Sequence, residues 1–515
     1  MKCIFKNSLI MKKLTMMVSA LLAWMGSAQW AAAQSKPNVI LIMTDQHRGD
    51  AMGCAGNNVV KTPNIDRLAA DGYLFGNAYT SCPSSTPARA GLLTGLSPWH
   101  HGMLGYGAVA EHYRYEMPQM MRDNGYYTFG IGKMHWAPQN ALHGFHGTLL
   151  DESGRVESKY FISDYRKWFM TQAPGMNPDS TGIGWNDHGA RVYQLPERLH
   201  PTVWTADEAI ELISNYHDSR PLMLKVSFAR PHSPYDPPQR VLNEYNGVAM
   251  PAAAHGAWSN EIGANLTDPN KNKEAAFGQF SPEYVDNSRR HYYAAITFID
   301  EQIGHIIEAL KKNGMYDNTL IIFTSDHGDM MGDHNMWRKT YAYEGSASIP
   351  MILKVPADMS VAKPKGSVID APVELRDILP TMLDAAGAEV PADMDGASML
   401  SLVKTSDAPW RQYIDLEHAT CYSDRNYWTA LTDGHLKYIW FLTTGEEQLF
   451  DLDLDPQETT NLAGNKKYKK QLAEMRAAMV KHLSERGEEW VKDGKLQTRT
   501  KTVLYSPNFP KPQKK

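Results

Sequence analysis

The chain has 515 residues, of which 43% are hydrophobic, and its formal net charge is -5 at pH 7. This length and composition describe a globular protein with large buried cores. The negative balance argues against nucleic acid as a partner, although a pocket of opposite local charge can still bind an anion.

The N-terminal segment predicts a signal peptide over residues 1–33. Lys12 and Lys13 precede an apolar stretch, and Ala31–Ala33 supplies a small-residue cleavage site. A membrane anchor is the alternative, but the stretch is shorter than the roughly 20 residues that a span requires. We therefore expect a periplasmic or secreted protein with no membrane span. The segment contains four lysines and no acid, so its removal changes the net charge from -5 to -9.

Short apolar runs, each followed by polar residues, indicate buried parallel strands. They cover residues 38–43, 127–131, 222–228 and 320–323. The spacing between them leaves room for helices, one of which ends at Asn313 and Gly314. We expect an α/β fold with a large doubly wound mixed sheet flanked by helices. Ligands of such sheets bind at the carboxyl ends of the strands.

The composition changes after Gly387. Residues 438–442 and 448–454 predict antiparallel strands, and a charged amphipathic helix is expected over 466–492. We therefore expect three parts: the signal peptide 1–33, an α/β domain 34–389 that carries the chemistry, and a C-terminal α+β subdomain 390–515 made of an antiparallel sheet and a helix.

The most informative motif is residues 85–95, which read STPARAGLLTG. It resembles the signature of the type I sulfatases of the alkaline phosphatase superfamily, in which a Cys or Ser becomes formylglycine. Counting back from Arg89 places the modified position on Ser85; the neighbouring Cys82 has Thr86 at the fourth step and no positive charge there. Ala88 departs from the usual Ser of the family.

The resemblance implies hydrolysis of a sulfate ester, with a sulfated carbohydrate as the expected substrate. Ser85 is expected to be oxidised before export by a radical sulfatase-maturing enzyme, which is therefore a predicted partner. The hydrated aldehyde would then attack sulfur, whereas an unmodified serine hydroxyl is a poor nucleophile. Arg89 would hold the hydrate and the sulfate.

Two strand ends supply the residue pairs that grip one divalent cation in this family. The pairs are Asp45 with Gln46 and Asp326 with His327, and the group derived from Ser85 completes the expected set. The resemblance implies Ca²⁺. The imidazole suits Mn²⁺ better than Ca²⁺, so Mn²⁺ is an alternative, and Mg²⁺ is a further alternative.

Four further residues match catalytic positions of the family: Lys133, His135, His232 and Lys339. The two lysines would neutralise the sulfate oxygens. His232, in preference to Lys339, would protonate the departing ester oxygen, and His135 would accept the proton whose loss releases sulfate.

Two other functions stay open at this point. Phosphonate monoester hydrolases and phosphodiesterases of the same superfamily share the Asp-Gln and Asp-His pairs, but they generally lack the Lys-x-His seen at Lys133 and His135. A glycan-binding protein on an inactive sulfatase scaffold is the third reading, although no expected site residue is missing.

Overall fold

The computed structural model describes residues 36–155 and 157–511. The predicted signal peptide 1–33 lies outside the described residues. From Pro37 onward the chain folds as one compact unit. None of the helices in the described ranges is long and apolar enough to cross a membrane.

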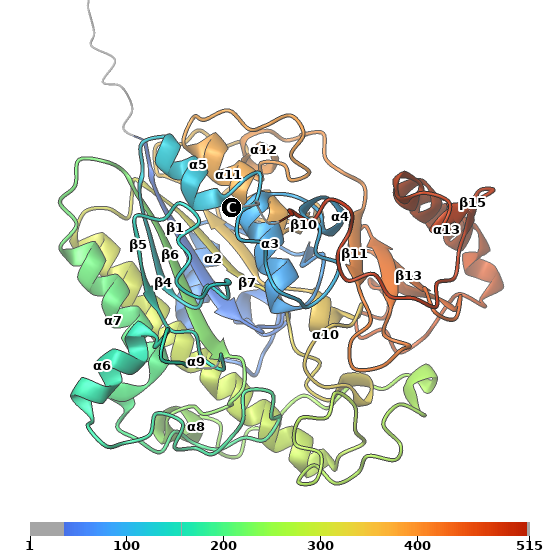
Figure 1. Ribbon diagram of the computed structural model, residues 1–515, viewed down its shortest axis with the longest axis horizontal. Helices are drawn as coiled ribbons and strands as arrows, with labels where there is room; N and C mark the ends of the chain where they lie inside the picture. Colours follow the sequence, from blue (N-terminus) through green and yellow to red (C-terminus); the bar gives the residue numbers. More distant parts are fainter. Residues whose placement is uncertain (1–35, 156, 512–515) are drawn as a thin grey trace, which may run out of the picture. The chain divides into compact units, whose positions relative to one another are not determined.

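An eight-stranded sheet forms the centre of the fold (Figure 1). The four strands that the apolar runs predicted lie side by side and parallel, whereas β8 runs antiparallel to β7. The predicted doubly wound mixed sheet is therefore confirmed. In order across the sheet the strands are β5 (Gly147–Leu150), β4 (Tyr127–Gly132), β6 (Leu222–Pro231), β1 (Asn38–Asp45), β7 (Thr319–Ser325), β8 (Met351–Lys354), β2 (Tyr73–Phe75) and β9 (Val368–Ile369).

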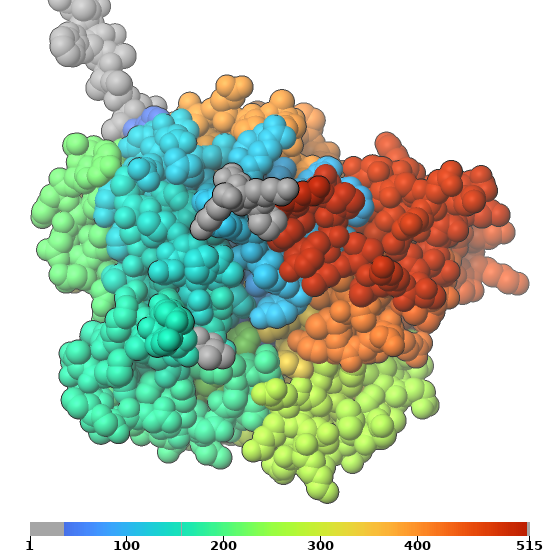
Figure 2. Space-filling model, in the orientation of Figure 1, coloured from blue at the N-terminus to red at the C-terminus, as the bar shows by residue number. Residues whose placement is uncertain are grey.

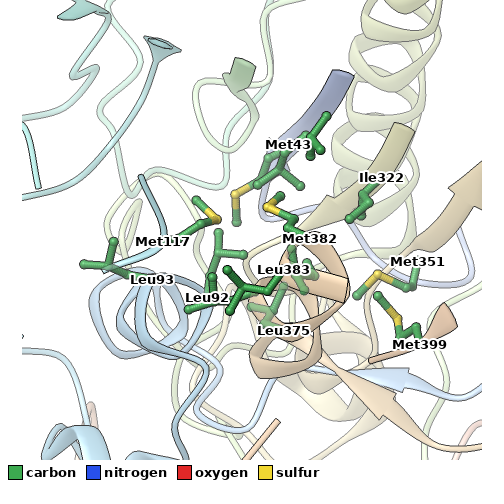
Figure 3. Packing of buried hydrophobic residues seen from close by; sticks show 14 of the residues in the cluster. Met43, Leu92, Leu93, Met117, Ile322, Met351, Leu375, Met382, Leu383 and Met399 are labelled. Carbon is green, nitrogen blue, oxygen red and sulfur yellow. The ribbon is translucent and has the colours of Figure 1, made fainter. Parts of the chain in front are cut away.

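Helices cover both faces of this sheet. Successive side chains of a strand point to opposite faces, so alternate residues of β1 belong to two different hydrophobic cores. Leu41 and Met43 pack against α3 (Ser85–Thr94), α5 (Met117–Asp123) and α11 (Ile378–Ala385). Figure 3 shows this methionine-rich core from close by. On the other face, the β1 isoleucines pack against α2 (Pro63–Ala70), α7 (Pro201–Ser214) and α9 (Pro282–Lys312). The predicted stop at Asn313 is confirmed as the C-cap of α9.

A four-stranded antiparallel sheet follows in the C-terminal part, as predicted. Its strands are β11 (Ile414–His418), β12 (Trp428–Thr432), β13 (Leu436–Phe441) and β14 (Glu447–Asp451). One face packs against α13 (Lys469–Leu483), and the other faces aromatic residues of the α/β part such as Tyr79 and Tyr343. The boundary at residue 390 stays a prediction.

The expected helix over 466–492 is wrong in its second half. The α-helix ends at Leu483, and Gly487 then takes a φ of 90°, which a helix cannot continue through. A short 3-10 helix over residues 484–486 and a turn follow α13, and a small hairpin of β15 (Val491–Lys492) and β16 (Lys495–Leu496) begins at the end of the expected range.

The last described segment returns to the α/β part. Leu104 N–H donates to Leu504 O, and Ser506 N–H donates to Gly102 O. Figure 2 shows this red segment against the blue surface of the N-terminal third.

The remaining short elements are η1 (Gly53–Ala55), β3 (Ala78–Tyr79), α4 (Pro98–His101), α6 (Asp164–Gln172), η2 (Glu197–Leu199), α8 (Gln239–Asn243), η3 (Ala257–Ser259), η4 (Asp333–Asn335), α10 (Glu344–Ala347), β10 (Val373–Glu374), η5 (Leu375–Asp377), α12 (Leu400–Lys404), η6 (Lys466–Tyr468) and η7 (Ser484–Arg486).

Candidate active site

The ends of four parallel strands bring the predicted site residues together at one edge of the sheet. Asp45 ends β1, Lys133 follows β4, His232 follows β6 and Asp326 follows β7. All four side chains are buried. The strands themselves are largely apolar and buried, with Lys225 in β6 as a buried exception, and the predicted site residues gather where the strands end.

Ser85 is the first residue of α3, and Ser84 before it is the extended N-cap. Pro87 lies in the first turn, where its missing N–H costs no hydrogen bond. The Ser85 hydroxyl lies 3.1 Å from Nε2 of His327. Nδ1 of His327 is 2.9 Å from the Gly328 carbonyl, so the proton is on Nδ1 and Nε2 offers a lone pair. Burial lowers the pKa of His327, which favours this neutral form.

Arg89 lies one turn further along α3 and bridges two strand ends. Its Nη2 is 2.8 Å from Asp45 Oδ2, and its Nε is 3.0 Å from Asp326 Oδ2. A third bond runs from Nη1 to the Lys133 carbonyl at 2.7 Å. The guanidinium and both carboxylates are buried, where charges interact strongly. Arg89 therefore offsets the repulsion between the two carboxylates.

Asp45 remains ionised despite its complete burial. Burial by itself would raise the pKa of this carboxyl, but nearby positive charges, Lys133 foremost and Arg89 among them, outweigh it and hold the pKa well below its usual value. Lys133 Nζ lies 2.8 Å from Oδ2. The second oxygen, Oδ1, is buried and has no hydrogen-bond partner among the described residues.

Asp45, Asp326 and His327 fit a divalent cation. One ligand atom from each lies within 4.8 Å of the others, and all three side chains are buried. The orphaned Oδ1 of Asp45 and the lone pair on Nε2 of His327 are the donors that such an ion needs.

Gln46, the fourth predicted protein ligand, is next to this group but is engaged by other residues. Its Oε1 accepts a 2.7 Å hydrogen bond from Lys339, and its amide nitrogen donates to Asp329. Its backbone N–H donates to Asp326 at 3.1 Å. A left-handed φ of 66° turns the chain here, which an unbranched residue tolerates better than a β-branched one. Its role as a metal ligand stays a prediction.

His232 and Lys339 form a direct pair, with 2.9 Å between Nε2 and Nζ. Nδ1 of His232 donates to the Ser233 carbonyl at 2.9 Å, so Nε2 accepts from the ammonium. Burial, followed by the charges of Lys339 and Lys133, lowers the pKa of His232 well below its usual value. Burial also lowers the pKa of Lys339 to about 8. Near neutral pH the proton between the two side chains is therefore on Lys339, and His232 is neutral.

His135 follows β4 in a left-handed conformation with a φ of 63°. The backbone N–H groups of Met134 and His135 both donate to Oε1 of Glu152 at 2.8 Å, which holds this turn in place. Nδ1 of His135 has no hydrogen-bond partner among the described residues. Burial, then the charges of Lys133 and Arg89, lowers its pKa well below the usual value, so the ring is neutral and can accept a proton.

These groups open into a cavity of 230 Å³. Ser85, Lys133, His135, His232 and Lys339 line it together. The rest of the lining comes from distant parts of the chain: Ser84, Tyr106, Ser153, Gly154, Arg155, Trp185, Asn186, Arg338, Thr340, Cys421 and Tyr422.

Several supporting residues were not predicted from the sequence. Asp329 lies three residues after Asp326, and its proximity to that strand end was an available signal. Glu152 likewise follows a strand end, that of β5. No local signal marks Tyr422, or His418, whose Nε2 reaches from the C-terminal sheet to within 2.8 Å of Ser84 Oγ at the N-cap of α3. Cys82, the rejected alternative to Ser85, is a buried free cysteine.

The fold and this site define a hydrolase of the alkaline phosphatase superfamily. Residues 37–388 match the family model described as Sulfatase, and residues 332–485 match the model of the N-sulphoglucosamine sulphohydrolase C-terminal region. The chain belongs to the sulfatase family and is a sulfuric ester hydrolase.

Known relatives span nearly the whole chain. An arylsulfatase of Clostridium perfringens is 39% identical, over 90% of this chain and 97% of its own length. An N-acetylglucosamine-6-O-sulfatase of Bacteroides thetaiotaomicron is 27% identical, over 85% of each. The solved phosphonate monoester hydrolase of Agrobacterium radiobacter is 27% identical, with a TM-score of 0.71, and covers 88% of this chain and 96% of its own.

Proposed function

We propose that this protein hydrolyses sulfate esters of carbohydrates, with a formylglycine derived from Ser85 as the nucleophile and one divalent cation. The observation that carries the proposal is the position of the Ser85 hydroxyl, 3.1 Å from His327 and beside the carboxylates that Arg89 bridges. A residue converted there stands at a helix N-terminus, which favours a bound anion.

Conversion to formylglycine supplies a hydrated aldehyde, a better nucleophile toward sulfur than the serine hydroxyl. Asp45, Asp326 and His327 would hold the cation, with Gln46 and residue 85 as further ligands. The bound ion supplies Lewis-acid polarisation of a sulfate oxygen and stabilises negative charge. Ca²⁺ is the proposed ion; Mn²⁺ is the alternative that the imidazole favours, and Mg²⁺ is a further alternative.

The remaining residues bind sulfate and move protons. Lys133 and Lys339 offer positive charge to the sulfate oxygens, in a cavity where burial strengthens the interaction. His232 delivers the proton that it shares with Lys339 to the departing ester oxygen. His135, neutral and with an unpartnered Nδ1, accepts the proton whose loss releases sulfate from residue 85.

A carbohydrate substrate is supported by the N-acetylglucosamine-6-O-sulfatase named above and by the cavity lining. Tyr106, Trp185 and Tyr422 offer aromatic faces, and Asn186 offers an amide, which together suit the apolar faces and hydroxyl groups of a sugar ring.

The proposed location is the periplasm or the exterior, reached through the signal peptide 1–33 after a maturing radical enzyme has acted on Ser85. The domain division at residues 389 and 390 is part of the same proposal.

The test uses protein co-expressed with a sulfatase-maturing radical enzyme. Mass spectrometry of the Ser85 peptide measures conversion, and a panel of sulfated mono- and disaccharides with an aryl sulfate measures sulfate release. We expect turnover in proportion to the converted fraction. Full turnover by unconverted protein would contradict the nucleophile. Glycan binding without any turnover by converted protein would instead support a binding protein.

Phosphodiester or phosphonate monoester hydrolysis is the second candidate, supported by the likeness to the Agrobacterium radiobacter enzyme. The same converted protein, assayed in parallel with an aryl sulfate and an aryl phosphonate monoester, separates the two functions. We expect sulfate turnover to dominate, because Lys133 and His135 flank the cavity. Dominant phosphonate turnover would overturn the main proposal.

A further inference from the structure

The catalytic cavity carries more positive charge than one sulfate ester requires. Among the described residues that line it, four side chains are cationic and none is Asp or Glu. A sulfate monoester in solution carries a single negative charge. The cationic residues are Lys133, Arg155, Arg338 and Lys339.

Three of these four cations already have strong polar partners. Lys133 pairs with Asp45 at 2.8 Å, and Arg155 pairs with Glu152 at 2.9 Å. Lys339 donates to an amide oxygen and to His232. Their charges are therefore compensated by, or shared with, groups of the protein.

Arg338 is different. Only 7% of the residue is exposed, and no described carboxylate lies at ion-pair distance from its guanidinium. Its Nη2 donates to the Glu274 carbonyl, and its Nε has no partner among the described residues. Buried polar groups are normally satisfied, so an arginine that lines the cavity with no carboxylate partner and an unpartnered Nε points to a ligand.

The Tyr422 ring holds this guanidinium from one side, with its centroid 4.5 Å from Cζ of Arg338. Both residues have left-handed backbones, with φ of 66° at Arg338 and 64° at Tyr422. Conformations of this kind cost energy in residues other than glycine, and they persist where the surrounding structure enforces them.

Thr340, two residues after Arg338, anchors this segment of the chain. Its N–H donates to the Pro83 carbonyl at 2.9 Å, and its own carbonyl accepts from the Trp428 indole at 3.0 Å. The arginine is therefore held in position before any substrate binds, which lowers the entropy cost of binding.

We propose that Arg338, stacked on Tyr422, is a binding subsite for a second oxyanion of the substrate. The oxyanion is a carboxylate or a second sulfate on the same or the adjoining sugar ring, since a guanidinium binds either group through two parallel hydrogen bonds. This inference rests on the proposed function and narrows it to sulfated sugars that carry at least two negative charges.

The test compares kcat/KM of matured wild-type protein on a matched set. The set contains 4-nitrophenyl sulfate, a monosulfated sugar, and the same sugar with an added carboxylate or an added sulfate. The variants are Arg338→Gln, Arg338→Lys, which keeps the charge, and Tyr422→Phe, which keeps the ring. Arg425→Gln removes an exposed arginine and serves as the matched control, and thermal unfolding verifies the fold of each variant.

We expect the wild type to prefer one dianionic sugar over the monosulfated one. Arg338→Gln should lower kcat/KM for that substrate about 10- to 100-fold, mainly through KM, the usual range for a lost hydrogen bond to a charged group. Turnover of 4-nitrophenyl sulfate should change less than about threefold. Arg338→Lys should recover part of the preference, and Tyr422→Phe and Arg425→Gln should keep it.

The dianionic sugar with the higher kcat/KM shows whether the subsite binds a carboxylate or a second sulfate. If Arg338→Gln lowered kcat/KM equally for all substrates, its role would be structural and the subsite would be overturned. Unchanged kcat/KM on every substrate would also overturn the subsite. A wild type that turns over the monosulfated sugar as well as or better than both dianions would overturn it too. Failure of the wild type to release sulfate from any ester would count against the proposed function instead.

Discussion

His418, at the end of β11 in the C-terminal sheet, lies 2.8 Å from the Ser84 hydroxyl at the N-cap of α3. Nδ1 of His418 donates to the Ala419 carbonyl, so Nε2 accepts from the serine. Both side chains are buried. The C-terminal sheet therefore supports the residue that immediately precedes the expected nucleophile.

Removing this contact should destabilise the protein. We expect His418→Ala to lower the free energy of unfolding by about 1–3 kcal/mol, because the buried Ser84 hydroxyl loses its partner. Urea unfolding followed by fluorescence measures the change. His435→Ala, on an exposed loop of the same sheet, should cost less than about 1 kcal/mol. Equal effects of the two variants would contradict the assigned contact.

The same histidine gives the stability a pH dependence. Burial lowers the pKa of His418 from 6.5 to about 4 in the folded protein. Between these values the unfolded chain binds the proton and the folded chain does not, so acidification favours unfolding. The slope that His418 contributes approaches about 1.4 kcal/mol per pH unit.

The variant His418→Asn isolates this contribution. Its free energy of unfolding should fall less steeply than that of the wild type when the pH is lowered from 6.5 to 4.5. Urea titrations at several pH values measure both slopes. Parallel curves for the two proteins would show that His418 does not titrate in this way.

Ser85→Ala should abolish hydrolysis and preserve the fold. No aldehyde can form at an alanine, so we expect kcat to fall more than about a thousandfold. The melting temperature should change little, because the side chain is small and its one hydrogen bond is to the neutral His327. Ser85→Cys keeps an oxidisable side chain at this position, so it is the matched control and should retain activity in proportion to the fraction that mass spectrometry shows converted. Residual turnover by Ser85→Ala near the wild-type level would reject the assignment.

Metal removal should lower both activity and stability. A cation that binds only the folded protein stabilises it by mass action, so dialysis against EDTA should lower the melting temperature. Readdition of Ca²⁺ or Mn²⁺ should restore it, and the concentration required identifies the preferred ion. Asp326→Asn should weaken this response, whereas Asp493→Asn, on the exposed surface, should not. A melting temperature insensitive to EDTA and to added ions would argue against the site.

Glu152→Gln should impair catalysis through the turn that carries His135. The charged acceptor of two backbone N–H groups becomes a neutral amide, which weakens both bonds. We expect kcat/KM for an aryl sulfate to fall about 10-fold, with the loss mainly in kcat. Glu488→Gln, an exposed control, should be neutral. A change in KM alone would indicate that Glu152 affects binding rather than the position of His135.

Much of the fold could be predicted because its signals are local. A strand buried on both faces is predominantly apolar, so β1, β4, β6 and β7 stood out as short hydrophobic runs. The helix expected to reach residue 492 was wrong, since charged residues continue through the turn at Gly487 and hide the end of α13. Charge alone does not distinguish a helix from a solvated hairpin.

For the site, the sequence alone determined the sulfatase signature and the residues at the strand ends, because parallel strands deliver their ends to one edge of a sheet. Only the tertiary structure decided that Gln46 faces Lys339, that Arg338 rests on Tyr422, and that His418 reaches Ser84. These contacts join segments up to 334 residues apart in the chain. No local pattern encodes such pairs, because their geometry depends on how segments far apart in the chain pack together.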